Sequence, residues 1–557
     1  MWHVFHCKVV AACLVLAATQ VEAARPPHIV FALADDLGWN NVGFQQLLSS
    51  PELAPEVRTP TIDELARTGL RLDRMYSFKY CSPSRSSFLS GRLPLHVTQN
   101  NNNNLVTNPG GADLRMELLP QRLREVANYS TAIVGKWHVG ARSQDNLPVN
   151  RGFDTHFGFL KGGEDHQNQH SEDDDGPGTG SISVVDLWRD TEPAYGENGT
   201  FSTFIYAREA SRVVRAHAAQ MHVSGQYKPL FLFLSWQAAH TPLEVPPGWS
   251  VRPVENDTQA KTRAHMNALV EILDQGMQNV TETLRETGMW NDSLVIFQAD
   301  NGGWIQNNFG GNNFPLRGGK VSDFEGGVRN IAVLNGGWLD DNLRGTVNTG
   351  LAHICDWYAT FEGIATRSIG ALTAESTDGR NNDGAIDYAH HLLGGESTGD
   401  VPPSDSIDLW STLIVPNATS NNRTEVPLSF CDAKAACDSP GGLGDAALIS
   451  GHWKIVMGSQ AGLGWHQGPR FPNASTAAVA PPADAGCVDE CLFDVFEDPG
   501  ELHNLREQNS TVFEELKARL DAIGQTTFQT NYSTAQNCVN AADSAAAHHG
   551  FLAPRCS

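Results

Sequence analysis

The stretch "IVFALADDLG" (residues 29–38) decides the fold, because a wholly apolar run ends in two aspartates and a glycine. An uninterrupted apolar run of this length is typical of a strand that is buried on both faces of a parallel sheet. Similar runs recur along the chain as "TAIV" (131–134), "LFLFLSW" (230–236) and "SLVIF" (293–297). Helical patterns lie between them, for example at 59–69 and 265–287. The alternation predicts an α/β fold whose large, mainly parallel sheet is flanked by helices.

Polar residues suited to chemistry follow each of these four runs. They are Asp35 and Asp36, Lys136 and His138, His240, and Asp300 and Asn301. Ligands of open parallel sheets bind beyond the carboxyl ends of the strands, so we expect these side chains to converge on one cavity. Taken singly each signal is weak, because an aspartate pair before glycine usually forms a turn and a lone histidine is usually structural. Three carboxylates and an amide oxygen would suit calcium or magnesium better than zinc.

Composition and charge limit the class of protein. The chain has 557 residues and a formal net charge of −24, which argues against a nucleic-acid partner. An anionic substrate would therefore need a locally basic pocket. Lys8, the apolar run "VVAACLVLAA" and the small residues of "VEA" (21–23) predict a signal peptide over residues 1–23 that is too short to span a bilayer. Ten Asn-x-Ser/Thr sequons follow, so we expect a glycoprotein of the secretory pathway, extracellular or lysosomal.

Most of the cysteines lie late in the chain. Six of them could form three disulfides with fifteen possible pairings: Cys431, Cys437, Cys487, Cys491, Cys538 and Cys556. Cys355 is expected to be a buried apolar residue, and Cys81 is the odd thiol. Gly-, Ser- and Asn-rich segments from about residue 370 predict a main domain over 24–425 and a smaller domain over 426–557, with a strand pair in "ALISGHWKIVMG" and a helix around 510–522. The acidic "SEDDD" (171–175) is expected to be an exposed loop.

Two motifs resemble the signatures of the sulfatase family. "CSPSRSSFLSGR" (81–92) matches C-x-P-S-R followed by L-[ST]-G-R, and "NYSTAIVGKWHVG" (128–140) is similar to G-Y-x-T-x-x-x-G-K-W-H, with Asn128 in place of the opening glycine. The likeness covers most of residues 27–507, and its order and wording are nearest to the arylsulfatase B (N-acetylgalactosamine-4-sulfatase) group. It implies an alkaline-phosphatase-like fold with a smaller C-terminal α+β domain that carries an antiparallel sheet.

The resemblance implies that Cys81 is oxidised to formylglycine by the formylglycine-generating enzyme. One hydroxyl of the aldehyde hydrate would attack sulfur to give a covalent sulfo-enzyme, and loss of the other proton would release sulfate. The implied metal ligands, for Ca²⁺ in most relatives, are Asp35, Asp36, Cys81, Asp300 and Asn301. Arg85 would hold the diol, while Lys136, His240 and Lys320 would bind the sulfate oxygens. His138 would be the base, and either His240 or Lys320 the acid for the leaving alcohol.

The implied substrate is a sulfated sugar of a polysaccharide or glycosaminoglycan, or an aryl sulfate. Two other functions stay open. Phosphomonoester and phosphonate hydrolases share this fold and much of the metal set, although they usually carry serine or threonine as the nucleophile. A non-catalytic glycan-binding relative is the third possibility, but no expected site residue is missing.

Overall fold

A computed structural model of the chain describes residues 25–101, 111–175, 179–254, 263–305, 309–370, 401–431, 445–458, 460, 490–528 and 538–556. Within this part, eleven strands form a large mixed sheet in the order β12-β2-β11-β10-β1-β9-β3-β4-β7-β8, with β13 also paired to β2. Their bounds are β1 His28–Ala34, β2 Leu70–Tyr76, β3 Ser130–Gly135, β4 Thr155–Gly158, β7 Trp188–Arg189, β8 Glu192–Pro193, β9 Leu230–Ser235, β10 Ser293–Ala299, β11 Arg329–Asn335, β12 Val347–Asn348 and β13 Ala352–His353. The predicted signal peptide, residues 1–23, lies outside the described residues.

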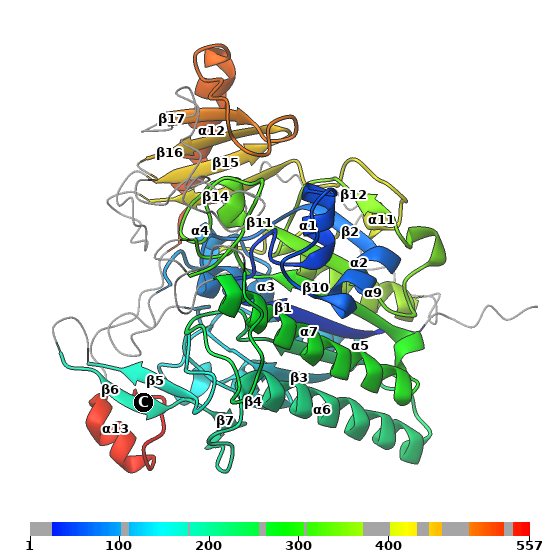
Figure 1. The fold of residues 1–557 in the computed structure, drawn as a ribbon, viewed down its shortest axis with the longest axis vertical. Helices are drawn as coiled ribbons and strands as arrows, with labels where there is room; N and C mark the ends of the chain where they lie inside the picture. Colours follow the sequence, from blue (N-terminus) through cyan, green and yellow to red (C-terminus); the bar gives the residue numbers. More distant parts are fainter. Residues whose placement is uncertain are drawn as a thin grey trace, which may run out of the picture.

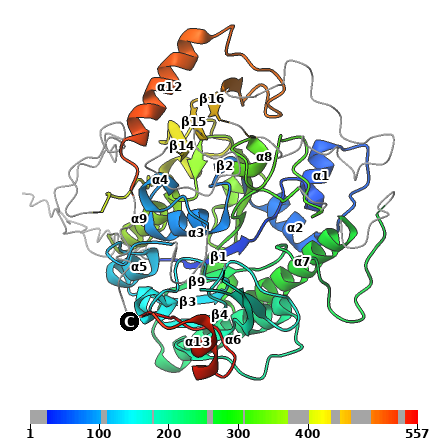
Figure 2. The same cartoon turned by 90° about the vertical axis from the view of Figure 1, so that its left-hand side faces the viewer.

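Helices cover both faces of this sheet (Figure 1 and Figure 2). Their bounds are α1 Gly43–Ser49, α2 Pro60–Thr68, α3 Cys81–Ser90, α4 Pro94–Val97, α5 Leu119–Ala127, α6 Ser202–Ser224, α7 Arg263–Glu286, α8 Glu325–Val328, α9 Asp356–Gly370, α11 Trp410–Leu413, α12 Ser510–Gly524 and α13 Ala541–Ala547. Alternate residues of β1 explain why two layers are needed. Phe31 packs in one core with residues of α3, α5 and α9, whereas Val30 packs in the other with residues of α2, α6 and α7. The predicted α/β architecture is confirmed.

The four predicted strands lie side by side at the centre of the sheet. β10, β1, β9 and β3 are consecutive neighbours, and every pair among them is parallel. Their carboxyl ends therefore open at the same edge, where the polar residues that follow them emerge. On one side β4 continues the parallel pairing, and β7 and β8 follow it in antiparallel pairs. On the other side β11 pairs antiparallel with β10, and β2 pairs antiparallel with β11.

A separate four-stranded antiparallel sheet lies beyond the large one (Figure 1). It consists of β14 Glu425–Phe430, β15 Ala446–Ser450, β16 Trp453–Met457 and β17 Glu490–Asp494. The predicted strand pair corresponds to β15 and β16, and the predicted late helix to α12, whose apolar residues pack on this sheet. The proposed domain boundary near residue 425 stays a prediction.

The last residues of the chain do not join the small sheet. Residues 538–556, with α13, lie against a two-stranded hairpin formed by β5 His170–Asp173 and β6 Ile182–Val185 (Figure 1). The expectation of an exposed loop at "SEDDD" is therefore wrong, because β5 pairs with β6 and buries Ser171 and Asp173. Among the described residues, no helix combines the length and apolar content needed to cross a bilayer.

The cysteines follow their predicted classes where the structure describes them. Cys538 and Cys556 form a disulfide, and Cys431 and Cys491 are also disulfide-bonded. Two other members of the late cluster, Cys437 and Cys487, lie outside the described residues. Cys355 is buried and free, as predicted, and Cys81 is the second free buried thiol of the described chain.

Candidate active site

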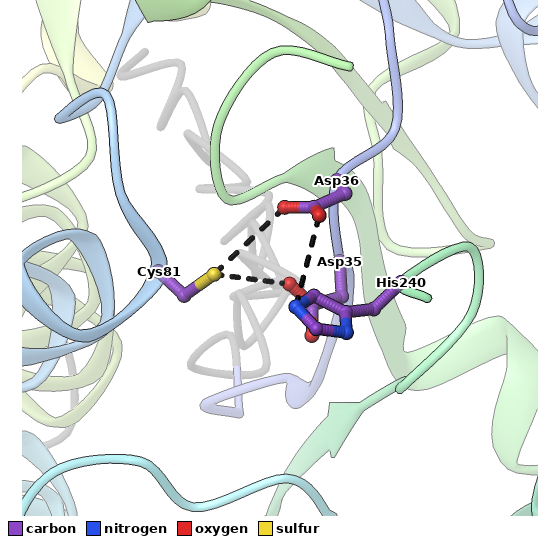
Figure 3. A group of neighbouring side chains, drawn as sticks. All are labelled: Asp35, Asp36, Cys81 and His240. Carbon is purple, nitrogen blue, oxygen red and sulfur yellow. Dashed lines mark hydrogen bonds and ion pairs between the residues drawn. The ribbon is translucent and has the colours of Figure 1, made fainter. Parts of the chain in front are cut away.

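Cys81 opens a helix that is buried along its whole length. It is the first residue of α3, and its thiol donates to Oδ1 of Asp35 at 3.3 Å and lies 3.8 Å from Oδ1 of Asp36 (Figure 3). Gly91 ends the same helix in the left-handed conformation (φ 68°), which explains the glycine of the "LSGR" motif. Burial and the Asp35 carboxylate raise the pKa of the Cys81 thiol well above its ordinary value. The thiol is therefore protonated in this setting and is a poor nucleophile.

Arg85 lies one turn after Cys81 and reaches the end of β10. Its Nε and Nη2 donate to Oδ2 of Asp300 at 3.0 and 2.8 Å, and its Nη1 donates to the Ser235 hydroxyl. The guanidinium also lies 3.8 Å from Asp35. Arg85 thus ties the cysteine helix to the ends of β1, β9 and β10. Its role in holding the diol stays a prediction.

Buried cations balance the buried carboxylates of the site. Nζ of Lys136 lies 2.5 Å from Asp35, and Nζ of Lys320 lies 2.8 Å from Asp36. Burial alone would raise the pKa of Asp36, but the Lys320 ammonium and the hydrogen bond from Asn301 hold it below its ordinary value. Every one of these groups is at least nine-tenths buried apart from His240, so their charges act in a medium of low dielectric constant.

Two histidines face this cluster in the neutral state. His138 has a left-handed backbone (φ 54°), and neither of its ring nitrogens has a hydrogen-bond partner among the described residues. Burial, followed by the nearby Lys136 and Arg85 cations, lowers its pKa well below the ordinary value. His240 donates from Nδ1 to the Thr241 carbonyl at 2.7 Å and points Nε2 towards Asp36 at 3.8 Å. Burial and Lys320 lower the pKa of His240 to about 3.

The residues suited to a metal ion lie together at the ends of β1 and β10. Donor atoms of Asp35, Asp36, Cys81 and His240 all lie within 4.8 Å of one another. Asp300 joins this group because its Oδ1 accepts from the Asp36 N–H at 3.2 Å. The side-chain oxygen of Asn301 is buried and has no hydrogen-bond partner in the described chain, whereas its Nδ2 donates to Asp36 at 2.8 Å. An orphaned buried oxygen beside three carboxylates fits a hard divalent cation.

A cavity of about 500 Å³ opens above these residues. Cys81, His138, His240 and Lys320 line its end beside the carboxylates, here called the deep end, and the rest of its lining, here called the outer wall, includes Lys161, His170, Glu172 and Trp304. None of these outer-wall residues was among the predicted site residues. Among them, Trp304 alone follows a predicted strand end, since it comes directly after "DNGG". Nζ of Lys320 lies 4.9 Å from the centre of the Trp304 indole ring. The other wall residues come from the 160–175 segment, which carried no readable signal.

Comparison with known proteins agrees with this geometry. The model of the family described as Sulfatase matches residues 27–365. Arylsulfatase J of Mus musculus is 30% identical over 91% of this chain and 77% of its own length, and N-acetylgalactosamine-6-sulfatase of Canis lupus familiaris is 31% identical over 69% and 70%. Two solved structures share the fold. Ps i-CgsB in complex with k-i-k-neocarrahexaose has a TM-score of 0.65 at 22% identity (91% and 95% covered), and PsFucS1 sulfatase from Pseudoalteromonas sp. has 0.58 at 21% (91% and 92%).

Proposed function

Because the chain belongs to the sulfatase family, we propose that it hydrolyses sulfate esters on a sulfated sugar of a polysaccharide or glycosaminoglycan. The names of its relatives support this substrate class, since one is an N-acetylgalactosamine-6-sulfatase and one related structure holds a neocarrahexaose. The likeness to the arylsulfatase B group stays a prediction.

The placement of Cys81 is the observation that carries the proposal. Its side chain points at the Asp35–Asp36 pair from the floor of a cavity, yet the thiol itself is kept protonated. We infer that Cys81 is converted to formylglycine by the formylglycine-generating enzyme during passage through the secretory pathway. The aldehyde hydrate supplies one hydroxyl that attacks sulfur and a second whose deprotonation expels sulfate, which a serine could not do.

Buried cations around Cys81 would bind the sulfate group. Lys136 and Lys320 now neutralise Asp35 and Asp36, and they become available to an anion when those carboxylates hold a divalent cation. We propose Ca²⁺, held by Asp35, Asp36, Asp300, Asn301 and the modified Cys81; it would polarise the ester and lower the pKa of the nucleophile. Fixed cations in a dry site stabilise the charge that develops on the sulfate oxygens.

Residues close to the Cys81 side chain would transfer the protons. His138 is neutral and unpartnered within the described chain, so its free nitrogen suits a base that takes the proton of the hydrate. His240 and Lys320 both border the cavity and remain the two candidates for the acid that protonates the leaving alcohol. Arg85 would orient the hydrate from its fixed position on Asp300.

Turnover of 4-methylumbelliferyl sulfate against the matching phosphate tests the proposal. We expect the sulfate to be preferred, Cys81→Ala to abolish turnover, and peptide mass spectrometry over residues 80–92 to show an aldehyde in the secreted protein. Cys355→Ala is the matched control, because it removes the other free buried thiol and should keep both activity and conversion. An intact Cys81 thiol in fully active protein would refute the mechanism, and preferred phosphate turnover would favour the phosphatase alternative.

A further inference from the structure

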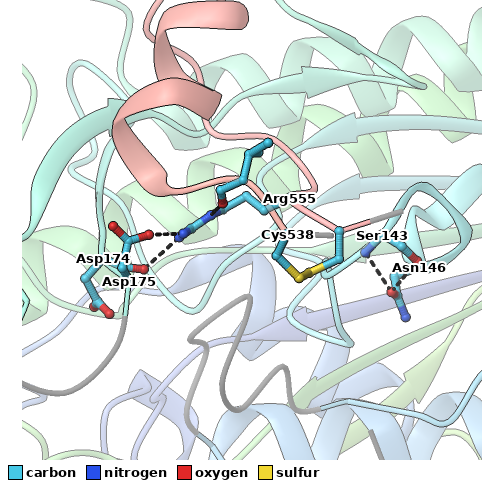
Figure 4. Close-up of a disulfide and its surroundings, with 8 residues drawn as sticks. Ser143, Asn146, Asp174, Asp175, Cys538 and Arg555 are labelled. Carbon is cyan, nitrogen blue, oxygen red and sulfur yellow. Dashed lines mark hydrogen bonds and ion pairs between the residues drawn. A yellow bond between two sulfur atoms is a disulfide. The ribbon is translucent and has the colours of Figure 1, made fainter. Parts of the chain in front are cut away.

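The C-terminal residues 538–556, here called the C-terminal strap, lie against the β5–β6 hairpin, and β5 of that hairpin borders the cavity. The Cys538–Cys556 disulfide closes the strap on itself over a separation of 18 residues (Figure 4). Within the strap, Phe551 forms a parallel bridge with Val185 of β6. The Val185 N–H donates to the Gly550 carbonyl at 3.0 Å, and the Leu552 N–H donates to the Val185 carbonyl at 2.8 Å. The strap is therefore joined to the edge of the β5–β6 hairpin by one bridge with two backbone hydrogen bonds.

Arg555 is the strap's main polar anchor on the hairpin. Its guanidinium is buried, donates to the Asp174 carbonyl at 2.7 Å and pairs with the Asp175 carboxylate (Figure 4). It also lies 3.5 Å from Oδ2 of Asp173. The Ala541 N–H adds a hydrogen bond of 2.8 Å to Asp175. A planar guanidinium that binds several acceptors at once fixes their relative positions more firmly than a flexible ammonium would.

The same hairpin forms part of the cavity's outer wall. His170 and Glu172 point outward from β5 and border the cavity, whereas Asp173 is buried on the other side with Arg555. The second oxygen of Asp173 lies 3.5 Å from Nζ of Lys161, which also borders the cavity and donates to the Glu172 carbonyl. One buried carboxylate is thus shared between a cation of the strap and a cation of the pocket.

A second link runs through the residue that follows β6. The Asp186 carboxylate accepts from the backbone N–H groups of Leu160 and Lys161, each at 2.9 Å. Because the strap pairs with Val185, it holds the residue next to this anchor. The strap is therefore linked to the Lys161 side chain through Asp173 and to the Lys161 backbone through Asp186. None of the strap's residues borders the cavity itself.

We propose that the C-terminal strap, through Arg555, positions the β5–β6 hairpin and Lys161 and so determines which leaving groups the pocket accepts. This rests on the proposed function, in which the sulfate binds at the deep end and its sugar lies along the outer wall. Arg555 is a positioning residue, since it contacts the wall and not the ligand. Asp173 lies 3.5 Å from Arg555 and 3.5 Å from Lys161. Without the Arg555 charge, Lys161 is the cation beside Asp173 among the described residues. The Asp173 carboxylate then attracts the Lys161 ammonium more strongly and draws it away from the cavity.

Binding of sulfated tetrasaccharides tests the proposal without turnover. In full-length protein carrying Cys81→Ala, dissociation constants are measured by calorimetry for four tetrasaccharides: chondroitin 4-sulfate, chondroitin 6-sulfate, heparin and iota-carrageenan. We expect Arg555→Met to weaken the tightest of these by about tenfold and Arg555→Lys, which keeps the charge, by less. Arg519→Met, which breaks a similar Arg–Glu pair on α12 away from the cavity, should leave the constants unchanged.

Two further measurements separate positioning from general damage. Hydrogen exchange in Arg555→Met should quicken at the amides of Val185, Leu552 and Lys161 while the β1 amides stay protected. With Cys81 present, kcat and KM for 4-methylumbelliferyl sulfate should stay within about twofold, because this small ester needs only the deep end. Unchanged dissociation constants despite faster exchange, no binding of any tetrasaccharide, or an equal loss of aryl sulfate turnover would each overturn the proposal. Absence of aryl sulfate turnover in the unsubstituted protein would instead count against the proposed function, whereas the dissociation constants and the exchange rates test the positioning by Arg555 separately.

Discussion

Replacing Lys454 with methionine is expected to lower the free energy of unfolding by about 3 to 5 kcal/mol, because it removes a buried cation from between two buried carboxylates. Lys454 belongs to β16 of the small sheet. Its Nζ lies 3.0 Å from Oε1 of Glu325 and 3.0 Å from Oε1 of Glu501, and all three side chains are fully buried. Glu325 opens α8 at the large sheet, so this ammonium joins the two sheets.

The magnitude follows from what the remaining groups can do. Methionine nearly conserves the volume of lysine, so little of the loss comes from a cavity. Glu325 would keep the Tyr76 hydroxyl at 2.8 Å and Arg329 at 3.5 Å, whereas Glu501 would keep the Glu325 N–H at 2.7 Å. Glu325 and Glu501 would then share an insufficient set of donors, and Glu501, whose pKa burial already raises to about 7, would take up a proton.

Urea unfolding followed by tryptophan fluorescence measures this loss at about pH 7. Arg519→Met is the control, because the Arg519–Glu425 pair is partly exposed and should contribute less than about 1 kcal/mol. Adding Glu501→Gln to Lys454→Met should restore part of the stability, since only one buried carboxylate is then left without its cation. A Lys454→Met protein within about 1 kcal/mol of the unsubstituted protein, or no rescue by the second change, would refute this reasoning.

Three other predictions concern protons and the metal ion. Burial raises the pKa of Glu501 from 4.5 to about 7 although Lys454 opposes it, so its stabilising contribution is complete below 4.5 and is lost as the pH rises through 7. Glu501→Gln should therefore flatten the decline in urea midpoint over that interval, and an unchanged slope would contradict the assignment. The rates of His240→Asn and Lys320→Met should depend differently on the pKa of the leaving alcohol. The variant that lacks the acid should lose about 100-fold more rate on an alkyl sulfate than on a nitrophenyl sulfate. Equal losses on the two esters in both variants would exclude both residues as the acid. Asn301→Leu should weaken Ca²⁺ binding by about tenfold in equilibrium dialysis, and unchanged affinity would remove Asn301 from the ligand set.

The centre of the fold was predictable because it depends on local pattern. Continuous apolar runs mark β1, β3, β9 and β10, since each is covered on both faces. β2 differs from these four, because its "LRLDRMY" begins with alternating apolar and polar residues and is not a continuous apolar run. Site residues at strand ends could be located in the same way, whereas Lys320 lies in a loop between β10 and β11 and came only from the family resemblance.

The hairpin beside the pocket could not be predicted from local sequence. Acidic "SEDDD" has the composition of an exposed loop, and its burial depends on a partner far along the chain. Asp173 becomes a buried strand residue because Arg555, 382 positions later, supplies a cation on one side and Lys161 supplies one on the other. Neither contact follows from spacing or periodicity. The residues of the outer wall could therefore not be predicted from the sequence, whereas those of the deep end could.

The acidic character of the chain and its proposed anionic substrate are compatible because the two charges act over different distances. A net charge of −24 spread over the surface is screened by salt within about 10 Å. Lys136 and Lys320 are buried beside Cys81, where the dielectric constant is low and screening is weak, so their attraction dominates once an anion enters the cavity. In the absence of substrate these ammonium groups pair with the matching carboxylates, Asp35 and Asp36. A site that binds a sulfate ester in an acidic protein therefore needs its cations buried close to the reacting group, and the end of β3 and the β10–β11 loop place Lys136 and Lys320 there.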